Sequence, residues 1–295
     1  MRSRTLRVLA TTLGIYVGVA ALFLTIASSR RGGEGARIFG PRVAVVELEG
    51  MILEVEDLVR DLKSYRDNPQ VKAVVIRINS PGGVVGPTQE LHQALMRVRE
   101  AGKPVVASLG SVAASGGYYT AVAADRIFAN PGTLTGSIGV IMQMANVESL
   151  FKKVGVNYVV VKAGRYKDLG NFSRPMTPEE RQVLQTLLDD VHAQFIDAVA
   201  AGRKLDRADV VKFADGRVFS GMQAKDLKMV DALGSLEDAV NEAAKLAGLP
   251  VPPGVIRPSR RFSLFDLVRS QLGVRLDGLA PPALPALRTL LYVMD

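Results

Sequence analysis

The sequence of 295 residues contains no cysteine and no tryptophan, and its only imidazoles are His92 and His192. The absence of cysteine excludes disulfides, thiol nucleophiles and thiolate metal centres. Aromatic residues make up 6% of the chain and no dense basic run accompanies the net charge of +8, so we expect no nucleic-acid partner. Covalent chemistry must therefore run on Ser, Lys, Asp or Glu, with or without one of the histidines.

One uncharged stretch near the N-terminus, residues 8–29, is typical of a membrane anchor. At about 1.5 Å per helical residue it can cross a hydrocarbon core of about 30 Å. A cleaved signal peptide has a shorter apolar region, of about 7 to 15 residues, which favours a transmembrane helix in the lipid bilayer. Basic residues on its two sides nearly balance, so the positive-inside rule leaves the orientation open. We expect a basic N-terminus at 1–7 and a flexible tether at 30–41.

The rest of the chain has the pattern of an α/β fold. Short β-branched runs bounded by Gly, Pro or Asn predict strands buried on both faces. Helical patterns alternate with them, which predicts parallel βαβ units. One domain is expected at 42–249, followed by a proline-rich apolar tail at 250–295 that is loosely attached or docked on a partner. The predicted strands are 43–48, 71–78, 104–109 and 158–162, and the predicted helices are 56–65, 88–100, 117–124, 147–154, 178–201, 207–213, 221–227 and 236–246.

A first glycine-rich turn, NSPGG at 79–83, follows the predicted strand at 71–78 and precedes a helix. Ligands of open α/β sheets gather at the carboxyl ends of strands. Because glycine has no Cβ, the backbone N–H groups of Gly82 and Gly83 can approach a ligand and point at developing negative charge. An ordinary strand-to-helix turn explains this motif equally well.

A second turn, SVAASGGYY at 111–119, follows the neighbouring predicted strand and opens a helix of small residues. It places the Ser115 hydroxyl at a helix N-terminus, with the Gly116 N–H available to an oxyanion. Alone, Ser115 reads as a helix cap beside glycines that permit close packing. Two backbone-donor turns at neighbouring strand ends, one of them carrying a serine, instead favour an acyl-transfer site.

A nucleophilic serine needs a base, and neither histidine is well placed to be one. His92 and His192 both fall inside predicted helices, where solvated or interface positions are expected. A lysine can serve if a dry pocket lowers its pKa from about 10.4 toward neutrality. Lys162 and Lys167 follow the predicted strand at 158–162, and Lys167 lies in a glycine-flanked loop between Arg165 and Asp168, where a surface role is also open.

These residues resemble signal peptide peptidase A, a family of membrane-anchored serine proteases with a Ser-Lys dyad and a fold related to the Clp protease and crotonase folds. The similarity runs from about residue 42 to 249. It rests on NSPGG at 79–83, SVAASGGYY at 111–119, NPGTLTGSIGV at 130–140 and KAGRYKDLGNFSRPMTPEER at 162–181. The resemblance implies that Ser115 is the nucleophile and Lys167 the general base. It further implies that Gly82 or Gly83 with Gly116 forms the oxyanion hole, and that Ser137 steadies the lysine amine.

The resemblance also carries expectations about partners and place. It implies a short, single-domain member that degrades cleaved signal peptides on the extracytoplasmic side of the cytoplasmic membrane. It implies a homo-oligomeric ring in which Ser115 and Lys167 of one site come from adjacent protomers, and a reaction that needs no metal or organic cofactor. Small residues around Ser115 suggest pockets for Ala, Leu or Val side chains.

Other functions remain open at the level of sequence. A crotonase-like hydratase or isomerase acting on acyl-CoA would use the same backbone oxyanion hole, although a membrane anchor would be unexpected. A Clp-like protease would need a histidine soon after the serine, and none occurs between Ser115 and Lys167. A non-catalytic membrane scaffold is disfavoured by the intact Ser and Lys positions. The apolar tail could also enter the active site of its own or a neighbouring subunit.

Overall fold

The computed structural model describes residues 40–258 and 291–293. The chain divides into two units, Met1–Pro41 and Arg42–Asp295, and every element below belongs to the second. The predicted anchor at 8–29 lies outside the described residues. Within the described part, no helix has the length and apolar character needed to cross a membrane.

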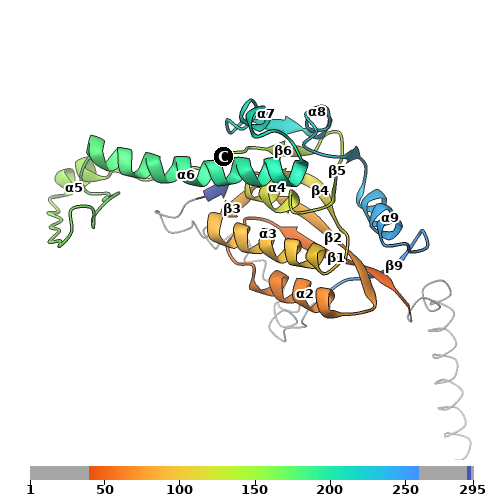
Figure 1. The fold of residues 1–295 in the computed structure, drawn as a ribbon. Coiled ribbons are helices and arrows are strands. Elements are labelled where there is room, and N and C mark those ends of the chain that lie inside the picture. Colours follow the sequence, from red (N-terminus) through yellow and green to blue (C-terminus); the bar gives the residue numbers. More distant parts are fainter. Residues whose placement is uncertain (1–39, 259–290, 294–295) are drawn as a thin grey trace, which may run out of the picture. The chain divides into compact units, whose positions relative to one another are not determined.

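The described residues form an eight-stranded, mostly parallel sheet (Figure 1). Its strand order is β7-β6-β4-β2-β1-β9, and β5 pairs with both β4 and β8. The β6–β7 pair is antiparallel, and the other pairs of this sheet are parallel. The strands are β1 (Arg42–Glu49), β2 (Val71–Ser80), β4 (Val105–Ala114), β5 (Arg126–Ala129), β6 (Leu134–Gly136), β7 (Val218–Ser220), β8 (Ala232–Leu233) and β9 (Gly254–Ile256).

The central strands are apolar because helices cover both faces of the sheet. In β1, Ala44 and Val46 pack into the larger core beneath α2, α3 and α4, while Val43 and Val45 pack beneath α9 on the other face. Figure 1 shows α9 on the opposite side of the sheet from α2 and α3. The predicted α/β class with a parallel sheet is therefore confirmed.

The helices follow the predicted order. Thr177 caps α6 with a capping box, because its hydroxyl accepts the Glu180 N–H at 3.2 Å while the Glu180 carboxylate accepts the Thr177 N–H at 2.9 Å. The helices are α2 (Glu56–Asp67), α3 (Val85–Glu100), α4 (Gly116–Ala121), α5 (Glu148–Val154), α6 (Pro178–Arg203), α7 (Arg207–Val211), α8 (Gly221–Asp226) and α9 (Leu236–Leu246).

The predicted strand at 158–162 is wrong. These residues have no regular structure, and the Val161 side chain is 96% exposed. The β-branched composition is that of a buried strand, but no sheet neighbour lies beside the segment within the described chain. Instead, Tyr158 packs against Phe151 and Phe172, with ring centroids 6.3 and 5.1 Å away.

The helix α6 carries this segment away from the sheet. Its C-terminal half is held by buried side chains, including Phe195 and Val199. Figure 1 shows its N-terminal half projecting beyond the sheet, with α5 and the connection 155–177 at the projecting end. The 26 residues of α6 correspond to an arm of roughly 39 Å.

Candidate active site

The two glycine-rich turns meet at the carboxyl ends of neighbouring strands. β2 and β4 pair in parallel, with Ser80 opposite Ala113. The first residues of α4 then lie against the NSPGG turn, since a Cβ built on Gly117 would fall 2.8 Å from the Ser80 carbonyl oxygen. The structure therefore brings both predicted turns to one place.

Ser115 joins β4 to α4 in a strained conformation. Its φ of 51° and ψ of −117° lie where L-residues rarely occur, at a cost of about 1 to 3 kcal/mol. The strain is held in place by two hydrogen bonds of 2.8 Å, one from the Ser115 N–H to the Gly136 carbonyl and one from the Tyr119 N–H to the Ser115 carbonyl. A backbone fixed in this way aims the side chain independently of its own contacts.

The Ser115 hydroxyl is buried and unpaired. The residue is 1% exposed, and its Oγ has no hydrogen-bond partner among the described residues. A buried hydroxyl without a partner is costly, so such groups mark sites completed by something else. Ser115 is thus no helix cap: its side chain accepts no hydrogen bond from α4.

Amide donors lie on two sides of Ser115. Gly116 is the first residue of α4, so its N–H has no acceptor within the helix. The Gly82 N–H donates to Ser80 Oγ at 3.1 Å. Gly82 and Gly83 both belong to a short strand, β3 (Gly82–Val84). The Ile52 N–H donates to the Gly82 carbonyl, and the Val84 N–H donates to the Ile52 carbonyl. The residues on both sides of Gly83 thus direct their polar groups toward Ile52. The Gly83 N–H therefore faces the other edge of β3.

That edge of β3 is occupied by the end of the chain. β10 (Leu291–Val293) pairs antiparallel with β3, with Tyr292 opposite Gly83. β10 also contacts α3 and α4. A segment of the apolar tail thus lies as an extended strand beside the predicted oxyanion glycines, in the manner in which peptides add to a sheet edge.

Ser137 lies close to Ser115 through the pairing of β4 with β6. Ala114 is opposite Gly136 in that pair, and Ser137 follows directly with a φ of 49°. Ser137 is 7% exposed, and its N–H donates to the Arg217 carbonyl at 2.8 Å. The pairing therefore places Ser137 near the nucleophile, and its predicted role toward the lysine amine stays a prediction.

Lys167 is not brought to Ser115 in this chain. It lies in the connection between α5 and α6, where its side chain is exposed and has no hydrogen bond or ion pair within the described residues. Lys162, the other candidate, forms an ion pair with Asp168 and donates to the Arg165 carbonyl at 3.0 Å. The buried hydroxyl and the exposed amine are therefore separate within one subunit.

Neither histidine forms a hydrogen bond with the Ser115 hydroxyl, and His92 is less solvated than predicted. It is partly buried on α3, with its ring centroid 5.1 Å from that of Tyr119. Burial lowers the pKa of His92 to about 4, and the positive charge of Arg99 adds to the effect. His192 lies 3.2 Å from the Ile138 carbonyl through Nε2.

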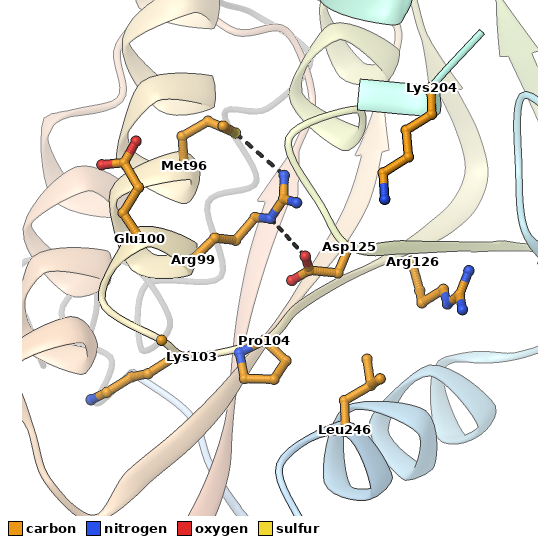
Figure 2. Close-up of a pocket in the computed structure, with 10 residues that line it drawn as sticks. Met96, Arg99, Glu100, Lys103, Pro104, Asp125, Arg126, Lys204 and Leu246 are labelled. Carbon is orange, nitrogen blue, oxygen red and sulfur yellow. Dashed lines mark hydrogen bonds and ion pairs between the residues drawn. The ribbon is translucent and has the colours of Figure 1, made fainter. Parts of the chain in front are cut away.

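A cavity of about 610 Å³ lies at the amino ends of the parallel strands, where β4 and β5 begin. Figure 2 shows Arg99 paired with Asp125 at 2.8 Å and Lys204 pointing into the same space. Ser115 follows the far end of β4, whose 10 residues span roughly 33 Å. This cavity is therefore separate from the candidate active site.

The comparisons with known proteins agree with this geometry. Residues 97–250, just over half of the chain, match peptidase family S49. The chain belongs to peptidase family S49. The matched range contains Ser115, Ser137 and Lys167, while Gly82 and Gly83 precede it. The S49 chain is a serine peptidase, and the predicted likeness to signal peptide peptidase A is confirmed.

Individual relatives cover different shares of this S49 chain. A protein with a provisional protease name from Synechocystis sp. is 46% identical over 210 residues, which is 70% of this chain and 75% of that protein. Protease 4 of Salmonella typhi is 37% identical over 219 residues, 71% of this chain and 35% of that protein. The chloroplastic serine protease SPPA of Arabidopsis thaliana is 33% identical over 273 residues, 92% of this chain and 39% of that protein.

One group of residues near Lys167 was missed by the sequence analysis. Asp168, Arg174 and Glu180 form ion pairs with one another and with Lys162. Their signal is present in the sequence, because charges of alternating sign recur every six residues from 162 to 180. The spacing matches neither a helix nor a strand, so a search by periodicity passes over it.

Proposed function

We propose that this S49 peptidase cleaves peptide bonds with Ser115 as nucleophile and Lys167 as general base. The observation that carries the proposal is the buried and unpartnered hydroxyl of Ser115, on a strained backbone directly before the first amide of α4. Gly83 and Gly116 supply the oxyanion hole once β10 has left the edge of β3 that the Gly83 N–H faces, whereas the Gly82 N–H donates to Ser80 within its own turn. Ser137 holds the lysine amine. The fold that presents them is of the Clp protease and crotonase type.

The base comes from a neighbouring copy. Lys167 is exposed within the connection 155–177, which Figure 1 shows at the projecting end of α6, while Ser115 is buried where β4 ends. In a homo-oligomeric ring the arm of one subunit reaches the serine of the next, and its amine becomes the hydrogen-bond partner that the Ser115 hydroxyl lacks. A single subunit would have a nucleophile without a base, and so would be inactive.

The reaction follows from these parts. The neutral Lys167 amine removes the proton of the Ser115 hydroxyl as the oxygen attacks the substrate carbonyl. The N–H groups of Gly83 and Gly116 stabilise the tetrahedral oxyanion. The resulting ammonium gives its proton to the leaving amine, and an acyl-enzyme remains. Water, deprotonated by the same amine, then hydrolyses the ester.

Cleaved signal peptides are the proposed substrates. Their small and aliphatic side chains suit the small residues that surround Ser115, and the β3 edge already accepts an extended apolar segment. The uncharged stretch at 8–29 is proposed to anchor the protein in the cytoplasmic membrane, with the protease domain on the extracytoplasmic side. Peptides released in the bilayer would then meet the enzyme at its surface.

A mixed-subunit experiment tests the dyad and its sharing together. Ser115→Ala and Lys167→Ala subunits are each expected to be inactive alone and correctly assembled. When the two are co-expressed, a site that combines an intact serine with an intact lysine from the next subunit regains activity. Random mixing predicts about a quarter of the wild-type sites. The measurement is the hydrolysis rate of a fluorogenic peptide per assembled particle.

The control is Ser115→Ala co-expressed with the double variant, which has no intact serine and should stay inactive. No recovery in the main mixture would exclude shared sites, and full activity of Lys167→Ala alone would exclude that lysine. Labelling by a fluorophosphonate separates the peptidase from a crotonase-like hydratase, because a nucleophilic Ser115 reacts and a backbone oxyanion hole does not.

A further inference from the structure

Four charged side chains tie the turn that carries Lys167 to the first turn of α6. We call Lys162, Asp168, Arg174 and Glu180 the ionic quartet. Lys162 pairs with one oxygen of Asp168, and Arg174 donates from Nε to the other at 3.0 Å. Arg174 also donates from Nη1 and Nη2 to the two carboxylate oxygens of Glu180, at 2.8 and 2.5 Å. The quartet is therefore one continuous chain of ion pairs.

The carboxylates of the quartet are the better shielded members. The side chains of Asp168 and Glu180 are 11% and 6% exposed, against 35% for Lys162 and 30% for Arg174. The hydrogen bond from Lys162, with help from Arg174, lowers the pKa of Asp168 to about 2. The hydrogen bond from Arg174 lowers the pKa of Glu180 to about 2. Both carboxylates stay charged across the working range of an enzyme near neutral pH.

The quartet fixes the backbone on both sides of Lys167. Lys162 closes the turn by donating to the Arg165 carbonyl at 3.0 Å, and the Lys167 N–H donates to the Gly164 carbonyl at 3.2 Å. On the other side, Asp168 is held by two cations and accepts the Asn171 N–H at its carbonyl. The position of Lys167 relative to α6 is thus set by side chains other than its own.

The charges of the quartet cancel. Two cations and two carboxylates leave no net charge beside an amine that must lose its proton to act as a base. Other charged groups lie in the turn itself and on the two helices that flank it. They are Arg165 in the turn, Glu179 and Arg181 at the start of α6, and Glu148, Lys152 and Lys153 on α5.

We propose that Asp168, Arg174 and Glu180 are positioning residues for the Lys167 base. Together with Lys162 they form a group without net charge, which holds the turn of Lys167 rigid on α6 without favouring the protonated amine. An uncompensated carboxylate at position 168 would stabilise the ammonium form and oppose catalysis. This inference rests on the proposed function, in which Lys167 acts on a neighbouring Ser115.

The pH dependence of activity tests the proposal with changes of opposite sign. Asp168→Asn and Glu180→Gln each remove a negative charge, so the acidic limb of the kcat/KM profile should move to lower pH. Arg174→Gln removes a positive charge, so the same limb should move to higher pH. Shifts of about half a pH unit are expected for charges at this separation. Arg174→Gln combined with Glu180→Gln should return the midpoint toward that of the wild type.

A matched control is the exposed pair Glu148 and Lys152 on α5, which lies in the same part of the chain but does not bind the turn. Glu148→Gln should leave both the limb and kcat unchanged. Thermal melting and particle size establish that each variant folds and assembles. Should Arg174→Gln fail to fold, Arg174→Lys keeps the charge, loses the paired contact to Glu180, and should lower kcat without moving the limb.

The outcomes distinguish a failure of Lys167 as the base from a failure of the positioning role alone. A wild-type profile without an acidic limb, or full activity of Lys167→Ala, overturns the proposed base and with it this inference. A normal wild-type limb with equal losses and no shifts in the quartet variants overturns the inference alone, and leaves the four residues a purely structural role. Shifts of opposite sign support the positioning role.

Discussion

Ser115 shows how one residue obtains its reactivity from its backbone. A serine at a helix start ordinarily caps the helix with its hydroxyl. Here the positive φ turns the side chain away from α4, and the capping hydrogen bond is absent. The hydroxyl is left buried and free to react, while the amides of α4 remain available to an anion. The strain at this residue is the structural cost of that arrangement.

Gly83 is a residue of the proposed oxyanion hole at which a single methyl group should be damaging. A Cβ built there would lie 2.1 Å from the Ile52 carbonyl oxygen, which is backbone and cannot move aside locally. Gly83→Ala should therefore displace β3, lower the melting temperature and abolish hydrolysis. The measurements are thermal melting and turnover of a fluorogenic peptide.

Gly86 offers the matched control for this change. It lies in α3, three residues along the chain, and a Cβ built there meets nothing within 4 Å. Gly86→Ala should keep full activity and gain up to about 0.5 to 1 kcal/mol of helix stability. If Gly83→Ala were as active and as stable as Gly86→Ala, Gly83 would have no place in the oxyanion hole.

At the scale of elements, the pairing of β10 with β3 places the tail where a substrate strand is expected. Ile52 takes the Gly82 carbonyl and the Val84 N–H. The N–H and carbonyl of Gly83 therefore point the other way, toward those of Tyr292 in the antiparallel pair. The neighbouring peptide groups of Leu291 and Val293 face away. The tail should therefore compete with peptide substrates for this edge.

Proline substitutions in β10 test this competition. Tyr292→Pro removes the N–H that faces β3 and should free the edge, so KM for a peptide substrate should fall by several-fold while kcat stays similar. Leu291→Pro removes an N–H that faces away and should leave KM unchanged. Steady-state kinetics on both variants decides the matter, and an equal KM in Tyr292→Pro, Leu291→Pro and wild type would show that the tail does not compete.

The elements also show where prediction from sequence succeeds. The helix start at 178 and the helix at 236–246 are set by local sequence, and the structure has both as predicted. The segment 158–162 has the composition of a buried strand yet no partner within the described chain. Composition reports what a segment can pair with, but whether a neighbour exists is decided by the fold. The occupied edge of β3 could not be predicted for the same reason, since β10 is over two hundred residues away.

For the whole molecule, the sequence motifs predicted the meeting of the two glycine-rich turns, because parallel strands place their carboxyl ends at one edge. They could not supply the conformation of Ser115, which depends on a contact with the distant Gly136, or the quartet around Lys167, whose six-residue spacing matches neither a helix nor a strand. A site divided between copies is a further step away, since no feature of one chain fixes how two copies meet. The family resemblance implies that division, and the burial of the hydroxyl together with the exposure of the amine supports it.

The stability of the whole molecule should depend on pH through His92. Burial holds the folded-state pKa of His92 at about 4, whereas an unfolded histidine has its usual 6.5. Between these values the unfolded chain binds a proton that the folded chain does not, so the free energy of unfolding should fall as the pH drops from about 6.5 to 4.

His92→Phe, which keeps an aromatic ring against Tyr119, should remove about 1 to 2 kcal/mol of this fall. Urea unfolding at pH 7.5 and 4.5 measures it, with His192→Gln as the comparison. Equal pH dependence in His92→Phe and wild type would mean that the ring is protonated, and hence hydrated, in the folded protein.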